Sequence, residues 1–216
     1  VANRYMVTFD LNDHASGNGS TNVESVTVGD TQLTIANGNI ELYVTYNTTY
    51  ATLYVLGEDG GYTAIAYDDF VDAISRLGYT FGGFYQEELA VNETPTTSPI
   101  SSATLFKTWN HTTVVYGYWT TNENTQYTVI HNIQGFGESD EFEATITRTA
   151  YGETDTSVQA ALLTAGDFLG EGLDINGFNM PVVQNVTISA DGNASVTYLY
   201  TRRYFSLTLI AGTGVA

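Results

Sequence analysis

Two short acidic stretches carry the oxygen ligands that calcium ions prefer in proteins. Neither stretch has the spacing of an EF-hand loop or of a calcium-binding nonapeptide repeat, and a solvated acidic loop accounts for the same residues. The first stretch directly follows an apolar alternation and is the candidate calcium site. The residues that bear these oxygens are Asp10, Asn12 and Asp13 in the first stretch and Glu138, Asp140 and Glu141 in the second.

Catalytic chemistry has little support in the sequence. The chain has no cysteine, which excludes thiolate catalysis, thiolate metal sites and disulfides. His14, His111 and His131 lie far apart, and none belongs to a metal-ligand motif or accompanies a nucleophile elbow. Asp68 and Asp69 form a carboxylate pair that the start of a helix explains better than acid–base catalysis does. We therefore expect a non-enzymatic protein without a cofactor.

The sequence contains residues for two kinds of covalent modification, an isopeptide bond and N-glycosylation. The single lysine, Lys107, would need to be buried beside a carboxylate to form an isopeptide bond, and its place in an edge-like strand argues against this. Asn-x-Ser/Thr sequons accept N-glycans only where the source organism makes them. The sequons begin at Asn18, Asn47, Asn92, Asn110, Asn185 and Asn193.

The balance of charges restricts the partners. Asp and Glu number 24 against 6 Lys and Arg, which gives a formal charge of -18 and a pI near 4.1. A basic patch that could bind nucleic acid or anionic lipid is therefore not expected. No apolar run approaches the roughly 20 residues that span a membrane.

The composition also indicates whether the protein lies inside or outside the cell. Thr, Tyr, Asn and Gly are abundant while lysine occurs once, a balance typical of extracellular proteins. The chain begins at Val1 rather than Met, so we expect a processed or excised segment. Together these features predict an extracellular surface protein.

Alternating apolar and polar residues predict a mostly β fold. Residues 40–46 place their apolar side chains on one face, and Asn37-Gly38 before them favours a type I′ hairpin turn. A second turn is expected at residues 191–193, where Asp-Gly-Asn precedes another alternating run.

One short helix is expected over residues 68–77. Asp68 or Asp69 would cap its N-terminus, and Gly78 follows its last turn. The apolar face of this helix would be formed by Phe70, Ile74 and Leu77.

Two segments of the chain repeat each other. Residues 34–56 align with residues 187–210 after a one-residue gap, and apolar side chains fall on the same face in both copies. This agreement between the faces is informative, because a slip of one residue in the alignment would turn the wrong face of the strand inward. Such repeats are typical of tandem arrays. The identical pairs are Thr34/Thr187, Ile35/Ile188, Gly38/Gly192, Asn39/Asn193, Tyr46/Tyr200, Tyr50/Tyr204 and Leu53/Leu207.

The second copy ends in the opening strand of a unit that it does not complete. Tyr204 to Ile210 alternates, with Phe205, Leu207 and Leu209 on one face, and these residues are the candidate assembly site. An apolar terminal strand frays unless another strand pairs with it. Two partners are open at this point: the strand closes its own module, or it adds to the sheet of a neighbouring chain.

Residues 78–85 (Gly-Tyr-Thr-Phe-Gly-Gly-Phe-Tyr), followed by residues 102–109 (Ser-Ala-Thr-Leu-Phe-Lys-Thr-Trp), resemble the Listeria–Bacteroides, or internalin B-type, repeat. Phe84 stands where that repeat usually carries Trp. The resemblance implies a small β-grasp-like module with one helix across a sheet.

Residues 127–131, 187–193 and 198–202 resemble the mucin-binding-protein type of repeat. Both kinds of repeat occur in long microbial cell-surface proteins, where they supply adhesin stalks and surface arrays. The resemblance therefore implies a place on the cell surface of a bacterium or archaeon. The resemblance implies no catalytic residues.

The fold class expected is a tandem of small β-rich modules, β-grasp-like with one short helix and with β-sandwich or β-grasp-like neighbours. The divisions are a β-rich N-terminal segment at 1–49, an internalin B-type module at 50–119, a mucin-binding-protein-like module at 120–203 and a C-terminal strand at 204–216.

Two functions agree with these patterns. The first is a non-enzymatic structural protein, either a repeat segment or a subunit of a cell-surface fibre or adhesin array, with neighbouring copies as partners in a homopolymer. The second is an adhesion module that binds a glycan or a host surface protein. Tyr43 and other tyrosines on exposed strand faces could stack on sugar rings, although cross-strand packing explains them as well.

The acidic charge leads to a prediction about stability. A formal charge of -18 repels itself in the compact state, and counter-ions screen that repulsion. We expect the melting temperature to rise on adding moderate salt or millimolar calcium, measured by a titration from low ionic strength. A melting temperature that responds to neither would show that the charges are too dispersed to affect folding.

Overall fold

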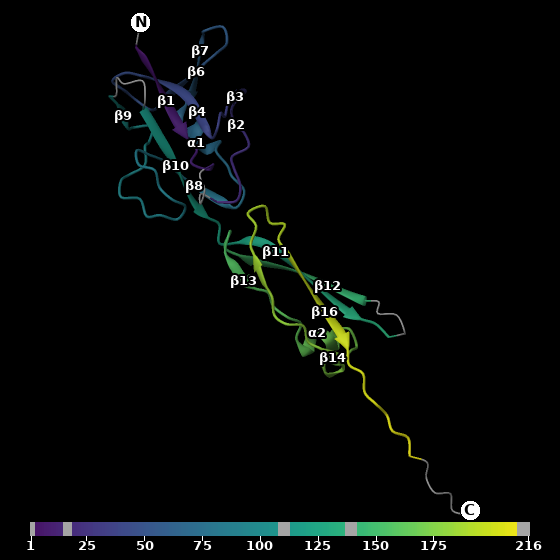
Figure 1. The fold of residues 1–216 in the computed structure, drawn as a ribbon. Coiled ribbons are helices and arrows are strands. Elements are labelled where there is room, and N and C mark those ends of the chain that lie inside the picture. Colours follow the sequence, from purple (N-terminus) through teal and green to yellow (C-terminus); the bar gives the residue numbers. More distant parts are fainter. Residues whose placement is uncertain (1–2, 15–18, 108–112, 137–141, 211–216) are drawn as a thin grey trace, which may run out of the picture.

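The chain forms two modules followed by an extended segment, and its fold is mostly β, as predicted (Figure 1). Each module has its own cluster of buried apolar side chains. The computed structural model describes residues 3–14, 19–107, 113–136 and 142–210. We call residues 3–121 the N-terminal module, residues 125–203 the C-terminal module and residues 204–210 the tail.

The N-terminal module contains ten strands and one helix among its described residues. They are β1 (Arg4–Asp10), β2 (Val26–Val28), β3 (Thr31–Leu33), β4 (Asn39–Thr45), β5 (Thr48–Thr49), β6 (Thr52–Leu56), β7 (Tyr62–Ala66), α1 (Tyr67–Asp72), β8 (Tyr79–Tyr85), β9 (Leu105–Phe106) and β10 (Thr113–Thr121). Six of the strands form one sheet in the order β7-β6-β4-β1-β10-β8, and the pairs β2–β3 and β5–β9 form two small sheets. β1 pairs in parallel with β10 and antiparallel with β4, so the first and last strands of the module lie side by side.

Aromatic rings fill the core of the N-terminal module. Phe9 on β1 lies edge-on to Phe70 of α1 at 5.1 Å and to Phe84 of β8 at 4.9 Å, and the rings of Phe70 and Phe84 stack at 5.7 Å. All three side chains are fully buried. The aromatic contacts therefore tie α1 to two strands of the sheet.

The C-terminal module is built on a four-stranded sheet in the order β12-β11-β16-β14. Its first strand, β11, pairs in parallel with its last strand, β16, as β1 does with β10. The elements are β11 (Thr125–Gln134), β12 (Phe142–Gly152), β13 (Ser157–Gln159), α2 (Ala165–Gly170), the 3-10 turn η1 (Ile175–Gly177), β14 (Phe178–Asn179), β15 (Asn185–Thr187) and β16 (Ser195–Arg202). β13 and β15 pair separately.

The predicted boundary between residues 49 and 50 falls inside the six-stranded sheet. β1 and β4 precede this boundary and the other four strands follow it, yet all contribute to one hydrophobic cluster. The structure thus differs from the sequence prediction, which treated residues 1–49 as a separate segment. The physical reason is the pairing of β1 with β10, a contact between residues far apart in the chain that local patterns do not encode.

The predicted helix exists but is shorter than expected. α1 covers Tyr67–Asp72, and its N-cap is Ala66, without a side-chain cap, so the prediction that Asp68 or Asp69 caps it is wrong. Both aspartates instead lie in the first turn, where the helix dipole favours negative charge. Ile74 is buried after the helix has ended, whereas Leu77 is 61% exposed and does not join the core. A second short helix, α2, was not predicted.

The predicted turns are present. Asn37 and Gly38 have φ values of +53° and +79°, which is the left-handed backbone that a type I′ turn requires. Ala36 and Asn39 exchange backbone hydrogen bonds across this turn. At the second turn Gly192 has φ +75° and donates to the carbonyl of Ser189.

The packing of the core predicts that substitutions at two positions differ greatly in their effect on the free energy of unfolding. Replacing Phe70, which stacks on Phe84, by Ala should lower the free energy of unfolding by about 3–5 kcal/mol because it opens a cavity. Leu77→Ala removes an exposed side chain and should change it by less than about 0.5 kcal/mol. Urea unfolding of both variants measures the contrast, and equal losses would contradict this description of the core.

Candidate functional site

The tail is the most exposed apolar segment among the described residues. The exposed fractions of Tyr204, Phe205, Leu207, Leu209 and Ile210 lie between 78% and 88%. The prediction that residues 204–210 form a strand is wrong for the chain by itself, because they have no strand conformation and make no backbone hydrogen bond with the described residues. The tail points away from both modules (Figure 1). It does not close its own module, which removes one of the two partners left open by the sequence.

A single backbone position explains why the two repeat copies diverge. In the first copy Asn47 has φ +58°, and the chain reverses there so that β6 pairs with β4. The aligned residue in the second copy is Thr201, which is part of the extended strand β16. Asn enters the left-handed region far more readily than a β-branched residue does. The second copy therefore continues straight into the tail.

The base of the tail is firmly held. Arg202 donates from its backbone N to Gln134 Oε1 at 2.8 Å and from Nε to the Gly135 carbonyl at 2.7 Å. Its guanidinium lies 3.4 Å from the centre of the Phe136 ring. Arg203 donates its backbone N–H to the Gly177 carbonyl. The tail thus leaves the C-terminal module from a fixed point and direction.

β16, the strand that carries the tail, is anchored by buried aromatic side chains. Tyr200 is fully buried, and its hydroxyl accepts from the backbone N of Leu163 at 2.8 Å and lies 3.0 Å from His131 Nδ1. The His131 ring stacks on Tyr198 at 5.6 Å. The sequence showed no metal-ligand or catalytic motif around His131, and the structure places its side chain in the core.

A polar joint connects the two modules. Asp155, whose φ is +60°, accepts a hydrogen bond from the Ser20 hydroxyl at 2.7 Å and another from the Tyr79 hydroxyl. Ala190 of the C-terminal module packs into the N-terminal core. A Cβ on Gly78 would lie only 2.5 Å from the Ala190 Cβ, so this contact requires glycine. In the sequence, Asp155 had no assigned role and Ala190 lay in a repeat motif without a contact, because their partners belong to the other module.

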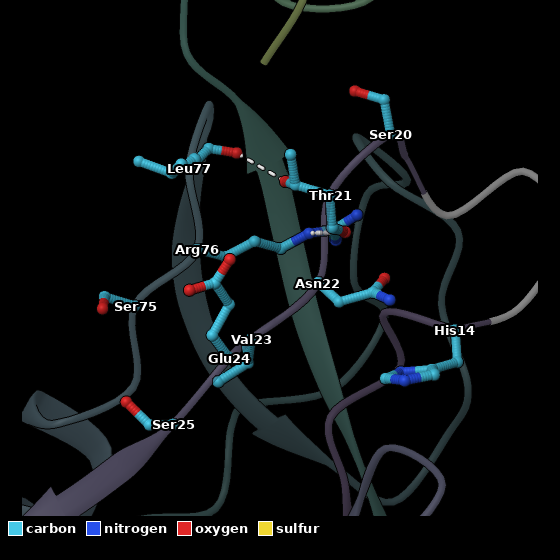
Figure 2. A pocket seen from close by; sticks show the side chains of 10 residues that line it. All are labelled: His14, Ser20, Thr21, Asn22, Val23, Glu24, Ser25, Ser75, Arg76 and Leu77. Carbon is cyan, nitrogen blue, oxygen red and sulfur yellow. Dashed lines mark hydrogen bonds between the residues drawn. The ribbon is translucent and has the colours of Figure 1, made fainter. Parts of the chain in front are cut away.

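A groove of about 730 Å³ lies beside this joint (Figure 2). Arg76 crosses it and donates from Nε to the Thr21 carbonyl at 2.7 Å, while the Thr21 hydroxyl donates to the Leu77 carbonyl at 2.7 Å. The Arg76 guanidinium also lies 4.0 Å from the centre of the Tyr79 ring. His14 lies on the opposite wall, and its only hydrogen bond among the described residues is with Asp13. No described serine is hydrogen-bonded to His14.

The candidate calcium residues form an internal hydrogen-bond network. Asn12 Nδ2 donates to the carbonyls of Leu89 and Gly117 at 2.8 and 3.0 Å, and Asp13 Oδ2 accepts from the backbone N of Val23 at 2.6 Å. Asp10 Oδ1 accepts from the backbone N of Asn12 at 2.8 Å. In the described ranges no group of three or more His, Cys, Asp or Glu could hold a metal ion. Calcium binding at Asp10, Asn12 and Asp13 stays a prediction, and Glu138, Asp140 and Glu141 lie outside the described residues.

The described sequon asparagines are all exposed. Asn47 and Asn185 are among them, and the Asn92 side chain also bonds to Thr121 through both its oxygen and its nitrogen. Asn193 is exposed in a turn and donates to Asp191 Oδ2 at 3.1 Å. Asn18 and Asn110 lie outside the described residues, as do His111 and the other residues of 108–112.

The tyrosines on the outer face of the six-stranded sheet pack against one another. Tyr43 and Tyr54 each meet Tyr62 edge-on, at 5.3 and 6.4 Å. The Arg4 guanidinium lies 3.9 Å from the centre of the Tyr54 ring and 4.7 Å from that of Tyr62. This arrangement favours cross-strand packing over an open platform for sugars.

No family model, curated protein or solved structure matches the chain. The likeness to internalin B-type and mucin-binding-protein repeats therefore stays a prediction. None of the helices in the described part of the chain is long and apolar enough to cross a membrane.

The anchor of β16 should respond to pH. Burial lowers the pKa of His131, as does the charge of Arg148, while Asp167 acts weakly in the opposite direction. The unfolded chain takes up a proton near the ordinary pKa of about 6.5, and the folded chain does so only at lower pH. Stability from neutral His131 is therefore complete above that ordinary value and is lost as the pH falls through the lowered value.

The test compares the wild type with His131→Gln by urea unfolding at pH 7 and pH 5. The wild type should lose more stability than the variant over this interval, because the variant retains every carboxylate but lacks the imidazole. Equal losses would show that protonation of His131 does not limit the stability of the C-terminal module.

Proposed function

We propose that this protein is a non-enzymatic structural subunit or repeat segment of an extracellular filament or array on the cell surface. Copies join head to tail when the tail of one adds a strand to the sheet of the next. The exposed, alternating tail at a fixed exit point carries this proposal, because an uncharged apolar strand that its own chain does not pair is what donor-strand assembly uses.

The shape of the molecule supports the same conclusion. The N-terminal module and the tail lie at opposite ends of the chain (Figure 1). A contact between one end and the opposite end of the next copy is heterologous and does not close, so it propagates into a filament. The joint around Asp155 and Ala190 keeps the two modules in register along that axis.

The composition and the resemblances support an extracellular location. A charge of -18 favours solubility of the protein, and a single lysine leaves its surface poor in basic binding patches. The chain also has no cysteine. The internalin B-type and mucin-binding-protein repeats that the sequence resembles build arrays of this kind.

Deleting residues 204–216 tests the proposal. Because the described part of the tail makes no backbone hydrogen bond and is almost fully exposed, the shortened protein should fold with an unchanged melting temperature and remain monomeric. The full chain should form filaments under the same conditions, seen by negative-stain electron microscopy and sedimentation. A shortened protein that unfolds, or that assembles like the full chain, would rule out donation.

A further inference from the structure

The sheet edges of the described residues are not equally open to a new strand. β8 already accepts a hydrogen bond at the Phe84 carbonyl from the backbone N of Ile100, at 2.7 Å. β12 carries the charged residue Arg148, which pairs with Asp167, and β14 is only two residues long. The strands of the two-stranded sheets have two or three residues each. This leaves β7, at the end of the six-stranded sheet, as the edge with the fewest obstacles.

β7 lacks the devices that protect an edge strand. Its sequence, Tyr-Thr-Ala-Ile-Ala, has no charge and no proline, and four of its five side chains are exposed. Among the described residues it pairs only with β6. Exposed edge strands without Lys, Pro or a bulge are sites where another strand adds.

We propose that β7 of one copy is the acceptor for the tail of the next copy, an inference that rests on the proposed function. The tail and β7 lie at opposite ends of the molecule (Figure 1), so the tail does not reach β7 of its own chain. The tail matches β7 in having no charge over residues 204–210. The added strand extends the sheet beyond β7.

One antiparallel register pairs residues 206–210 of the tail with β7 and places two apolar side chains beside apolar neighbours. Leu207 lies opposite Ile65, the buried residue of β7, and extends the inward row that begins with Leu53 of β6. Ile210 then lies opposite Tyr62, beside Leu56. These last three side chains are 88%, 42% and 45% exposed in the free chain. A slip of one residue would turn Leu207 outward, and the contacts of Leu207 with Ile65 and of Ile210 with Tyr62 would both be lost.

The charges beside the two segments complement each other. Arg202 and Arg203 immediately precede the tail, and Asp68 and Asp69 lie just after β7 at the start of α1. In a chain with 24 acidic and 6 basic residues, the exposed Arg203 at the base of the tail favours its approach to an acidic end.

Engineered disulfides test the register, because the chain has no cysteine of its own. Ala64 and Thr208 lie directly opposite each other in the register, within the reach of a disulfide. The full chain with Ala64→Cys and Thr208→Cys should give a ladder of oligomers on a non-reducing gel after mild oxidation. Each single variant should stop at dimers. As a matched control, Thr80→Cys with Thr208→Cys places the first cysteine on β8 and should give no ladder.

A charge introduced on β7 provides a second test of the acceptor. Thr63→Lys puts an ammonium group where Leu209 would pack, and it should abolish filaments while leaving the melting temperature unchanged. Thr27→Lys makes the same change on the exposed face of β2 and should assemble as the wild type does. The disulfide result decides the matter should Thr63→Lys fail to fold.

The outcomes separate this inference from the function beneath it. Suppose that deletion of residues 204–216 abolishes filaments. If Thr63→Lys then assembles normally, or if the ladder forms with Thr80→Cys instead of Ala64→Cys, donation stands and β7 is not the acceptor. If the chain that lacks residues 204–216 still assembles, the proposal of strand donation is wrong. Loss of filaments in Thr63→Lys together with a ladder specific to the Ala64 and Thr208 pair supports both.

Discussion

The backbone conformation at one repeat position distinguishes the first copy, which folds back, from the second copy, which stays extended. Asn47 bends into the left-handed region and returns the chain to pair with β4. Thr201, at the same position of the second copy, continues β16 in a straight line. Because β14 already pairs with the end of β16, no strand of the described C-terminal module takes the tail in, and its apolar side chains remain in water.

The joint between the modules depends on a second close fit. Gly78, at φ +78°, brings the backbone against Ala190, and Asp155 reaches across to Ser20 and Tyr79. Only residues 122–124 connect β10 to β11. Such a short connection with packed and hydrogen-bonded surfaces on both sides resists bending, which suits the proposed place of the protein in a filament.

Most of the few cationic side chains contact neighbouring groups of their own chain. Arg4, Arg76 and Arg202 each lie over aromatic rings, and Arg148 pairs with Asp167. Guanidinium groups stack on rings better than ammonium groups do, which agrees with five arginines beside a single lysine. The acidic side chains consequently dominate the outer surface, where mutual repulsion keeps copies apart except at matched sites.

Local patterns in the sequence were enough to predict the β class, the turns at Asn37-Gly38 and 191–193, the burial of Phe70 and the apolar alternation of the tail. These features depend on side-chain periodicity and on which residues tolerate a left-handed backbone, and both can be read from neighbours in the chain. The contrast between Asn47 and Thr201 was also present in the aligned repeat and could have indicated that the second copy does not fold back.

Only the tertiary structure decided that residues 1–49 share a sheet with residues 50–121, that α1 ends at Asp72, and that the tail lies free. Each of these outcomes depends on pairing or packing between residues far apart in sequence, such as β1 with β10 or Gly78 with Ala190. A strand's pattern shows which face it buries but not which strand lies beside it, because the hydrogen bonds between strands are the same for every sequence.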